Sequence, residues 1–371
     1  MAAVSRRQIL LGGGALIGAS MIPGANIIRG AFGEDLAKPD YMIRMGTNEN
    51  PWGPSRPALQ AIVDSIKMSN LYGGNRRALL ALMGEINNVP VDHISIGTGS
   101  GEILKTAGML VSMEKGSIVC ADPTYHDLVR YAERVGSEII RVPVDRETLT
   151  TDLNAMYKAI RGDTKCVYLV NPNNPIPSII EKNALREFVL EVSKDRMVFI
   201  DEAYFEFVDN PDYASMMDLV RDGHNNIIVA RTASKIHGLA GLRVGFGFAH
   251  PDLTQRINNA KTGGISVLGL NAAIASYQDQ HFQDFTIARN RESLDIVEGM
   301  FDELGHRYVK SNANFTFVYT GRDIREVNQE FRAENCMVGR PFPPMTDWMR
   351  VSMAKPDEMR YFTQVYRKIL G

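Results

Sequence analysis

Short apolar runs alternate with longer amphipathic stretches through most of this chain, and this rhythm limits the possible folds more than any other feature. The apolar runs are rich in β-branched residues, a composition typical of strands. They occupy residues 94–96, 117–121, 138–142, 166–170, 197–200, 227–230 and 244–248. Helical patterns lie between several of them, at residues 102–111, 126–135, 149–160 and 182–192. This alternation predicts an α/β fold in which a mostly parallel sheet is sandwiched between helices.

The rhythm changes near residue 284. We expect a long helix over residues 285–304, strands at 315–319 and 350–352, and helices at 323–334 and 358–369. This order predicts a smaller α+β domain over residues 284–371, preceded by a large domain over residues 76–283. Residues 34–75 contain an extended segment and a helix that could join either domain, and residues 1–33 form a leader.

The leader has the composition of an export signal. Arg6 and Arg7 stand directly before a glycine-rich apolar run over residues 11–22, which is too short to span a bilayer comfortably. An arginine pair in this place is typical of the twin-arginine type of signal. We therefore expect a periplasmic or otherwise exported protein that keeps no stable membrane anchor. The alternative is a chance basic dipeptide before a first core helix in a cytoplasmic protein.

Charge and cysteine usage argue against several classes of function. The formal net charge is −2, so no basic field favours binding to nucleic acid. Cys120, Cys166 and Cys336 are far apart and lack a CxxC pattern. Neither a disulfide framework nor a metal site is expected, and buried thiols are the simpler interpretation.

Polar residues follow the predicted strands at the ends where ligands bind in open α/β sheets. Asp201 comes directly after a buried strand, where a carboxylate needs a cationic partner such as a protonated pyridine nitrogen. Tyr204 could donate to an oxygen on the same ring, or it could be an ordinary core tyrosine. Lys235 follows the next strand, where partial burial would leave some of its amine unprotonated and able to condense with an aldehyde.

The residues around this lysine suit a phosphate group. Thr232, Ser234 and Arg243 have hydroxyl and guanidinium groups that bind phosphate. Residues 97–101 (GTGSG) lie between a strand and a helix start, where backbone amides and the helix dipole favour an anion. A glycine-rich turn or a serine–lysine pair alone is common without any function. The interpretation therefore depends on the whole set in this order.

The set resembles the fold-type-I pyridoxal-phosphate (PLP) aminotransferases, and most closely the histidinol-phosphate aminotransferase group. The resemblance runs from about residue 41 to the C-terminus. The matching segments are residues 48–55 (NENPWGPS), 122–125 (DPTY), 171–175 (NPNNP), 201–204 (DEAY) and 234–245 (SKIHGLAGLRVG). The resemblance implies the PLP-dependent transferase fold and pyridoxal 5'-phosphate as the cofactor. It also implies a small-molecule amino donor, a keto-acid acceptor and a homodimer with shared active sites.

The resemblance implies a role for each matching residue. Lys235 is similar to the lysine that holds PLP as a Schiff base and moves the proton, with Asp201 facing the pyridine nitrogen and Tyr204 the ring oxygen. Further cofactor-binding positions are implied for Ser100, Gly101, Tyr125, Asn174, Thr232, Ser234 and Arg243, and for Tyr72 of a neighbouring subunit. Substrate-binding positions are implied for Asn50, Arg340 and Arg350, although Arg340 alone could be a solvated surface residue.

The chain departs from the usual family pattern at three places. Ile176 and Pro177 stand where the family usually has Thr-Gly, Gly101 stands where many relatives have aspartate, and residues 265–270 lack the usual proline and tyrosine. These differences are expected to affect the substrate and phosphate sides of the site. Because histidine biosynthesis is a cytosolic pathway, the export signal also favours a different substrate.

We therefore expect a PLP-dependent aminotransferase. A PLP-dependent decarboxylase on the same scaffold would instead release carbon dioxide without a keto product. A non-catalytic PLP-binding protein would hold the cofactor without turnover. The complete set of acid, base and ring partner disfavours the last alternative, because binding alone does not need a proton shuttle.

Overall fold

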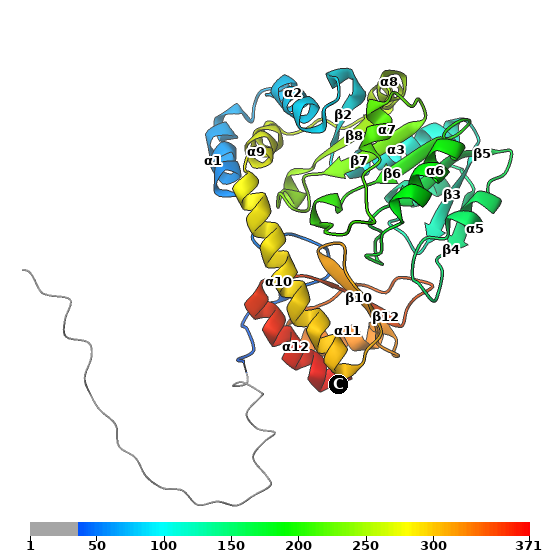
Figure 1. The fold of residues 1–371 in the computed structure, drawn as a ribbon. Helices are drawn as coiled ribbons and strands as arrows, with labels where there is room; N and C mark the ends of the chain where they lie inside the picture. Colours follow the sequence, from blue (N-terminus) through cyan, green and yellow to red (C-terminus); the bar gives the residue numbers. More distant parts are fainter. Residues whose placement is uncertain (1–35) are drawn as a thin grey trace, which may run out of the picture. The chain divides into compact units, whose positions relative to one another are not determined.

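A seven-stranded sheet forms the centre of the fold in a computed structural model, which describes residues 36–371. The strands are β2 (Ile94–Thr98), β3 (Ser117–Asp122), β4 (Ile139–Pro143), β5 (Thr164–Val170), β6 (Met197–Asp201), β7 (Ile227–Thr232) and β8 (Val244–Ala249). Their order is β2-β8-β7-β6-β5-β3-β4, and neighbours are parallel except in the two pairs that include β8. All seven predicted runs join this one sheet, and the predicted α/β fold is confirmed (Figure 1).

Both faces of this sheet are buried, which explains its continuous apolar strands. All five residues of β6 are buried. Val198 and Ile200 belong to one hydrophobic cluster, whereas Phe199 between them belongs to a second cluster. Successive side chains of a strand point to opposite faces, so each face needs its own cover. The second cluster contains α3 (Ser100–Met113), α4 (Asp127–Arg134) and α8 (Pro251–Ala260), and the first contains α6 (Lys182–Val192) and α9 (Val267–Tyr277).

One helix is shorter than its sequence pattern predicted. α5 spans Leu153–Lys158, whereas the pattern indicated residues 149–160. Leu149 has a φ of 57°, in the left-handed region, so a right-handed helix cannot run through it. The side chain of Asp152 then accepts a hydrogen bond from the Ala155 backbone N–H at 2.9 Å and caps the helix. The helix therefore begins at its cap and not where the apolar pattern starts.

The C-terminal part has its own hydrophobic cluster around a small antiparallel sheet. β12 (Trp348–Ser352), β10 (Phe315–Tyr319) and β9 (Tyr308–Val309) lie side by side in that order. The helices of this part are α10 (Gln280–Leu304), α11 (Ile324–Ala333) and α12 (Pro356–Leu370). α10 begins earlier than residue 285 because Asp279 caps it, its side chain accepting from the Phe282 N–H at 3.1 Å.

The segment between residues 41 and 75 contributes to the C-terminal hydrophobic cluster and to one of the two clusters on the main sheet. β1 (Ile43–Arg44) pairs in parallel with β11 (Cys336–Met337), and Ile43 is part of the C-terminal cluster. α1 (Arg56–Ser65) contributes Ala58 to the cluster on the main sheet. The extended strand and the helix thus join different cores. The domain boundaries expected from the sequence stay a prediction.

The predicted leader, including Arg6 and Arg7, lies outside the described residues. No helix within residues 36–371 is long and apolar enough to cross a membrane. Cys120, Cys166 and Cys336 are all buried free thiols, as the sequence indicated.

Candidate active site

A cavity of about 490 Å³ opens at the carboxyl ends of β5, β6 and β7. The last residue of each of these strands, Val170, Asp201 and Thr232, lines it. Residues 46–49 from the N-terminal segment and several residues of the C-terminal part line it as well. The predicted site residues that line the cavity are Ser100, Gly101, Tyr125, Asn174, Asp201, Tyr204, Thr232, Ser234, Lys235, Arg243, Arg340 and Arg350.

Asp201 is a buried carboxylate that has no guanidinium partner among residues 36–371. Its side chain is among the buried polar groups, and Oδ1 accepts a hydrogen bond from the Ala203 N–H at 3.1 Å. Burial raises the pKa of the Asp201 carboxyl from 3.8 to about 7, against the lowering effects of the Ala203 N–H and the Lys235 charge. A cation brought against this carboxylate would therefore be stabilised strongly by it.

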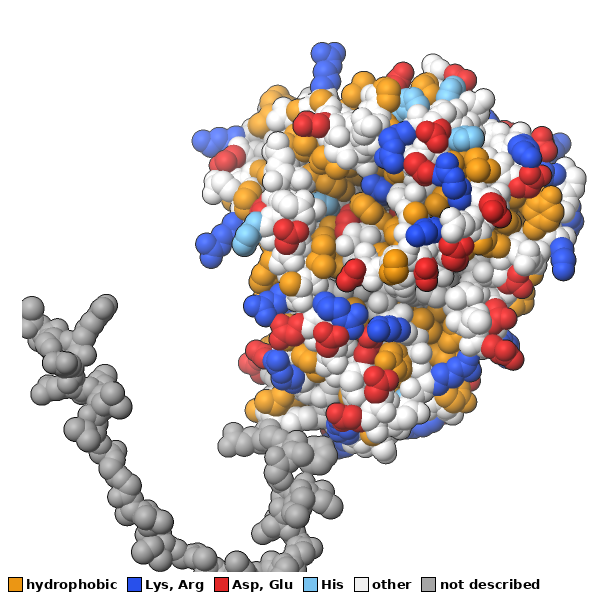
Figure 2. Space-filling model, viewed as in Figure 1, with side chains coloured by type: hydrophobic (Ala, Val, Ile, Leu, Met, Phe, Trp, Pro, Cys, Tyr) orange, Lys and Arg blue, Asp and Glu red, His pale blue; other side chains and the backbone are white. Residues whose placement is uncertain are grey.

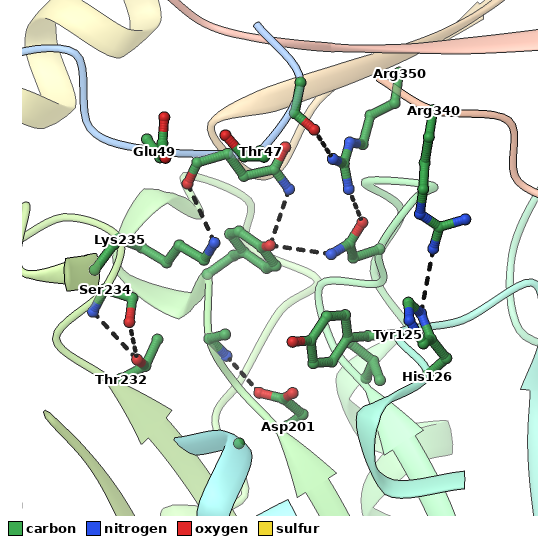
Figure 3. A pocket seen from close by; sticks show the side chains of 18 of the residues that line it. Thr47, Glu49, Tyr125, His126, Asp201, Thr232, Ser234, Lys235, Arg340 and Arg350 are labelled. Carbon is green, nitrogen blue, oxygen red and sulfur yellow. Dashed lines mark hydrogen bonds between the residues drawn. The ribbon is translucent and has the colours of Figure 1, made fainter. Parts of the chain in front are cut away.

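Lys235 lies in the same cavity, beside Tyr204. Its Nζ donates to the backbone carbonyl of Asn48 at 3.2 Å and lies 5.3 Å from the centroid of the Tyr204 ring (Figure 3). Both contacts leave the amine at the cavity surface. Beside it, Thr232 Oγ1 donates to Ser234 Oγ at 2.9 Å, and the Ser234 N–H donates to Thr232 Oγ1 at 3.1 Å.

Tyr204 is held in place by a chain of hydrogen bonds that reaches the C-terminal sheet. Its hydroxyl oxygen accepts from Asn48 Nδ2 at 2.9 Å and from Asn174 Nδ2 at 3.1 Å. Asn174 Oδ1 in turn accepts from Arg350 Nη1 at 2.6 Å, and Asn48 Oδ1 accepts from Ser352 Oγ at 2.6 Å. The proton of the Tyr204 hydroxyl therefore stays available for a ligand.

Arg350 combines a positive charge with deep burial. Its relative exposure is 7%, and burial lowers the pKa of its guanidinium to about 10. Its Nε has no hydrogen-bond partner among the described residues. An unsatisfied buried donor on a charged group is costly, so this guanidinium is suited to receive an anionic substituent of a ligand.

A cradle for an anion forms where Arg243 meets the start of α3. A side-chain carbon at Gly99 would lie 2.1 Å from Arg243 Nη2, and one at Gly245 would lie 2.0 Å from the Ser100 nitrogen. Only glycine allows the backbone and the guanidinium to approach this closely. Arg243 Nη1 donates to the Ala240 carbonyl at 3.0 Å, and the positive end of the α3 dipole adds to the field.

A buried ion pair holds the ends of β6 and β7 together behind the cavity. Glu202 and Arg231 are 2.9 Å apart and both are buried. Arg231 also donates to Asn87 Oδ1 at 2.7 Å, and Glu202 accepts from Ser215 Oγ at 2.7 Å and from the Met216 N–H at 2.8 Å. Glu202 follows Asp201 and Arg231 precedes Thr232. The pair therefore restrains both strand ends on which the cavity residues stand.

Two predicted residues are not brought into this cavity. Asn50 Nδ2 donates to the Ile236 carbonyl at 2.8 Å, and its side chain lines a different, small recess. Tyr72 is fully exposed, with a relative exposure of 105%, and lies outside the cavity of its own chain. Its predicted role requires a second subunit, so it stays a prediction.

The departures from the family pattern lie at different distances from the cavity. Ile176 and Pro177 are buried and do not line it, and Pro177 instead accepts from the Asn312 N–H at 3.2 Å. Residues 265–270 do not line it either. A side-chain carbon at Gly101 would lie 3.2 Å from Asp127 Oδ2. The carboxylate of Asp127 therefore already lies beside the position at which the resemblance implies an aspartate in many relatives.

Several polar residues of the cavity were not predicted from the sequence, and Asn48 and His126 are two of them. Asn48 has a φ of 54° and is buried, and its backbone and amide contact Lys235 and Tyr204. Its place in the matching segment 48–55 was the one available signal. His126 accepts a hydrogen bond at Nδ1 from Arg340 Nη2 at 3.2 Å, and nothing local in the sequence indicates this pairing.

Together these groups can hold a small anionic ring compound that has a basic nitrogen. Asp201 would face the nitrogen, and Arg243 with the α3 start would hold an anionic substituent. Lys235 would lie against the ring as an amine base, and Arg350 would meet a second anionic molecule. Among residues 36–371, no group of three or more His, Cys, Asp or Glu side chains could hold a metal ion.

Comparisons with known proteins agree with this geometry. Residues 40–365 match the family model for aminotransferase class I and II. The chain is 35% identical over 338 residues to a histidinol-phosphate aminotransferase of Moorella thermoacetica, covering 89% of this chain and 86% of the relative. It is 30% identical over 335 residues to another from Akkermansia muciniphila, covering 90% and 91%. A solved histidinol-phosphate aminotransferase from Sinorhizobium meliloti, in complex with pyridoxal-5'-phosphate, has the same fold, with a TM-score of 0.81 at 24% identity and coverage of 89% and 91%.

Proposed function

This chain belongs to the class I and II aminotransferase family, and we propose that it is a PLP-dependent enzyme that moves an amino group between an amino compound and a 2-keto acid. One observation carries the proposal. An acid (Asp201), an amine (Lys235) and a buried guanidinium (Arg350) line a single cavity. Relatives named histidinol-phosphate aminotransferases make histidinol phosphate one donor to test.

The cavity fits pyridoxal phosphate by the chemistry of its residues. The raised pKa of Asp201 is the expected property of a carboxylate that lacks its cationic partner, and a protonated ring nitrogen would supply that partner. The absence of a side chain at Gly99 lets the guanidinium of Arg243 approach the backbone at the start of α3, where it would hold the phosphate group. When bound, PLP supplies an aldehyde that takes up the amino group and a ring that spreads negative charge from the α-carbon.

The residues of this chain then orient the donor and move its proton. Arg350 would hold an anionic substituent of the donor, close to Asn174 and Tyr204. Lys235 Nζ, once its amine is free, would take the proton from the α-carbon and return it to the aldehyde-derived carbon on the other side of the amino nitrogen, as a positioned amine does in general acid–base catalysis. Tyr204 would donate its free hydroxyl proton to an oxygen of the ring.

The test is amino-group exchange by the purified protein. The protein loaded with PLP is incubated with single amino donors, histidinol phosphate among them, and the aminated cofactor and the keto product are measured. Return of the original absorbance after addition of a 2-keto acid is expected. Release of carbon dioxide without a keto product, or no change with any donor, would contradict an aminotransferase.

We further propose that two copies assemble into a homodimer with shared sites. An apolar stripe on and after α1 supports this: Leu59, Val63 and Ile66 are 48%, 59% and 55% exposed. These positions lie on one helix face at the i, i+4 and i+7 spacing. The fully exposed Tyr72 follows this stripe, and its phenol could reach the cavity of a second copy.

Charging this stripe should separate the copies. In the variant with Leu59→Glu and Val63→Glu we expect the mass measured by light scattering to fall from two chains to one, because two like charges buried without a partner are costly at an interface. Met113→Glu is the control, since Met113 is 73% exposed on a different helix. An unaltered protein that is monomeric at micromolar concentration would refute the dimer.

The leader supports a proposal for localisation. Arg6 and Arg7 precede the short apolar run, so we propose export by the twin-arginine route. With Arg6→Lys and Arg7→Lys together, the protein should accumulate inside the cell, as cell fractionation would show. Export of that variant at the normal level would contradict the proposal.

A further inference from the structure

A second cavity, of about 280 Å³, adjoins the proposed active site. The two cavities share four lining residues, Thr124, His126, Arg340 and Phe342. The second cavity continues along α4 and past the ends of β3 and β4, where Arg130 and Arg141 line it. The two cavities therefore meet at Arg340, with Lys235 in the first cavity and Arg130 and Arg141 in the second.

Arg340 is held at the boundary between the cavities by neutral contacts. Its Nη2 donates to His126 Nδ1 at 3.2 Å, and its guanidinium lies 4.3 Å from the centroid of the Phe342 ring (Figure 3). A guanidinium only donates, so His126 must accept at Nδ1. Burial, and then the charges of Arg340 and Arg130, lower the pKa of His126 and keep it neutral. His126 thus orients Arg340 without competing for an anion.

Arg130 and Arg340 repel each other. Burial and the charge of Arg130 lower the pKa of the Arg340 guanidinium. Neither arginine has an ion pair with an acid within residues 36–371. The acids that line the second cavity are not paired with them: Glu133 is paired with Arg141 at 3.1 Å, and Asp122 forms no ion pair with Arg130 or Arg340 among the described residues. An anion between the two guanidinium groups would relieve this repulsion.

The face drawn in Figure 2 does not resemble such a cluster. Lysine, arginine and acidic side chains are interspersed over it, without a broad field of one sign. Arg130 and Arg340 differ from this pattern, because neither forms an ion pair with an acid in the part of the chain that the structure describes.

We propose that Arg130 and Arg340 form a distal subsite that binds a second acidic group, a carboxylate or a phosphate, at the far end of the amino donor. The inference rests on the proposed function and narrows its substrate class. Arg350 would hold the acidic group nearest the reacting carbon, and the distal pair would select donors that carry another one. Donors with a neutral far end would lack this contact.

The test is the selectivity of Arg130→Gln between matched donors. Glutamate against glutamine tests a carboxylate, and O-phosphoserine against serine tests a phosphate. For the acidic series that the subsite accepts, the ratio of kcat/KM for the acidic over the neutral donor should fall by about tenfold or more, since one charge-assisted contact is lost. The loss should appear in KM, because the contact is far from the reacting carbon.

Arg134→Gln is the matched control. Arg134 is an exposed arginine on α4, one turn further along, and it lines neither cavity. It removes the same charge from the same helix, so an equal fall in the ratio would mean a general field and not a subsite. A second measurement does not depend on turnover: in protein saturated with PLP, inorganic phosphate or glutarate should raise the Tm of the unaltered protein more than that of Arg130→Gln.

The outcomes separate this inference from the proposed function. If no donor is turned over by the unaltered protein, the proposed function fails. If donors are turned over but Arg130→Gln leaves both ratios unchanged, or if the unaltered protein prefers neutral donors, the distal subsite is wrong. A Tm effect of free phosphate without any change in either ratio would indicate only adventitious anion binding and would also overturn it.

Discussion

Replacing Lys235 with alanine is expected to lower kcat for amino-group transfer by about 10³-fold or more, because no other amine lines the cavity among the described residues. The protein should still fold, since Nζ makes a single hydrogen bond, to the Asn48 carbonyl. Single-turnover formation of the aminated cofactor, followed by absorbance, measures the loss directly. Borohydride reduction and mass spectrometry should find PLP on the peptide that contains Lys235 in the unaltered protein, and on no peptide of the variant.

The control for this prediction is Lys310→Ala, which removes an exposed lysine from outside the cavity and should leave kcat unchanged. A small primary amine added to Lys235→Ala should restore part of the activity, because it can enter the space that the side chain left. Normal transamination by Lys235→Ala would refute the proposed function.

Replacing Asp201 with alanine is expected to lower kcat by about 10²-fold or more, because a preorganised charge at the ring nitrogen would be lost. The buried carboxylate would no longer stabilise a protonated ring nitrogen, and the ring would accept less charge from the α-carbon. Affinity for PLP should fall as well, which equilibrium dialysis measures. Asp209→Ala, which makes the same change at an exposed acid on the same segment, is the matched control.

The pKa of Asp201 also predicts a pH dependence of stability in protein prepared without PLP. Its folded-state pKa of about 7 lies above the ordinary value of 3.8, so the folded state binds the proton more tightly than the unfolded state. Stability should therefore fall as the pH rises from about 4 to 7 and stay low above that range. In Asp201→Asn the loss of stability caused by ionisation of this carboxyl should be absent. Bound PLP should make the loss smaller, because its protonated ring nitrogen would stabilise the carboxylate. Equal pH profiles of Tm for the unaltered protein and Asp201→Asn would contradict the burial argument.

The strands of the main sheet could be predicted because a few consecutive apolar residues are enough to indicate a buried strand. A strand covered on both faces must be apolar at every position, as Val198, Phe199 and Ile200 are. Helix limits were harder, because they depend on single caps and single backbone angles. The capping by Asp152 and the left-handed φ of Leu149 shorten α5 in a way that the apolar pattern does not contain.

α8 and α9 were not predicted. The pattern of α9 is apolar around much of its circumference, because it packs against both α1 and α2 (Arg76–Asn87). An amphipathic period appears only where one side of a helix faces water. The split of residues 41–75 between two cores was left open by the sequence, because it depends on long-range contacts such as the pairing of β1 with β11.

The sequence by itself determined which strands are followed by reactive side chains. Asp201 and Lys235 stand where a buried strand ends and polar residues follow. Parallel strands bring such ends to one edge of the sheet. Tertiary structure alone decided which distant groups meet there. Asn48 and Ser352 are hydrogen-bonded although 304 residues separate them in the sequence, and Arg340 is hydrogen-bonded to His126 across 214 residues. Whether a strand or helix is buried can be recognised from the residue types of a short stretch of sequence. The meeting of two surfaces depends instead on how every intervening element packs.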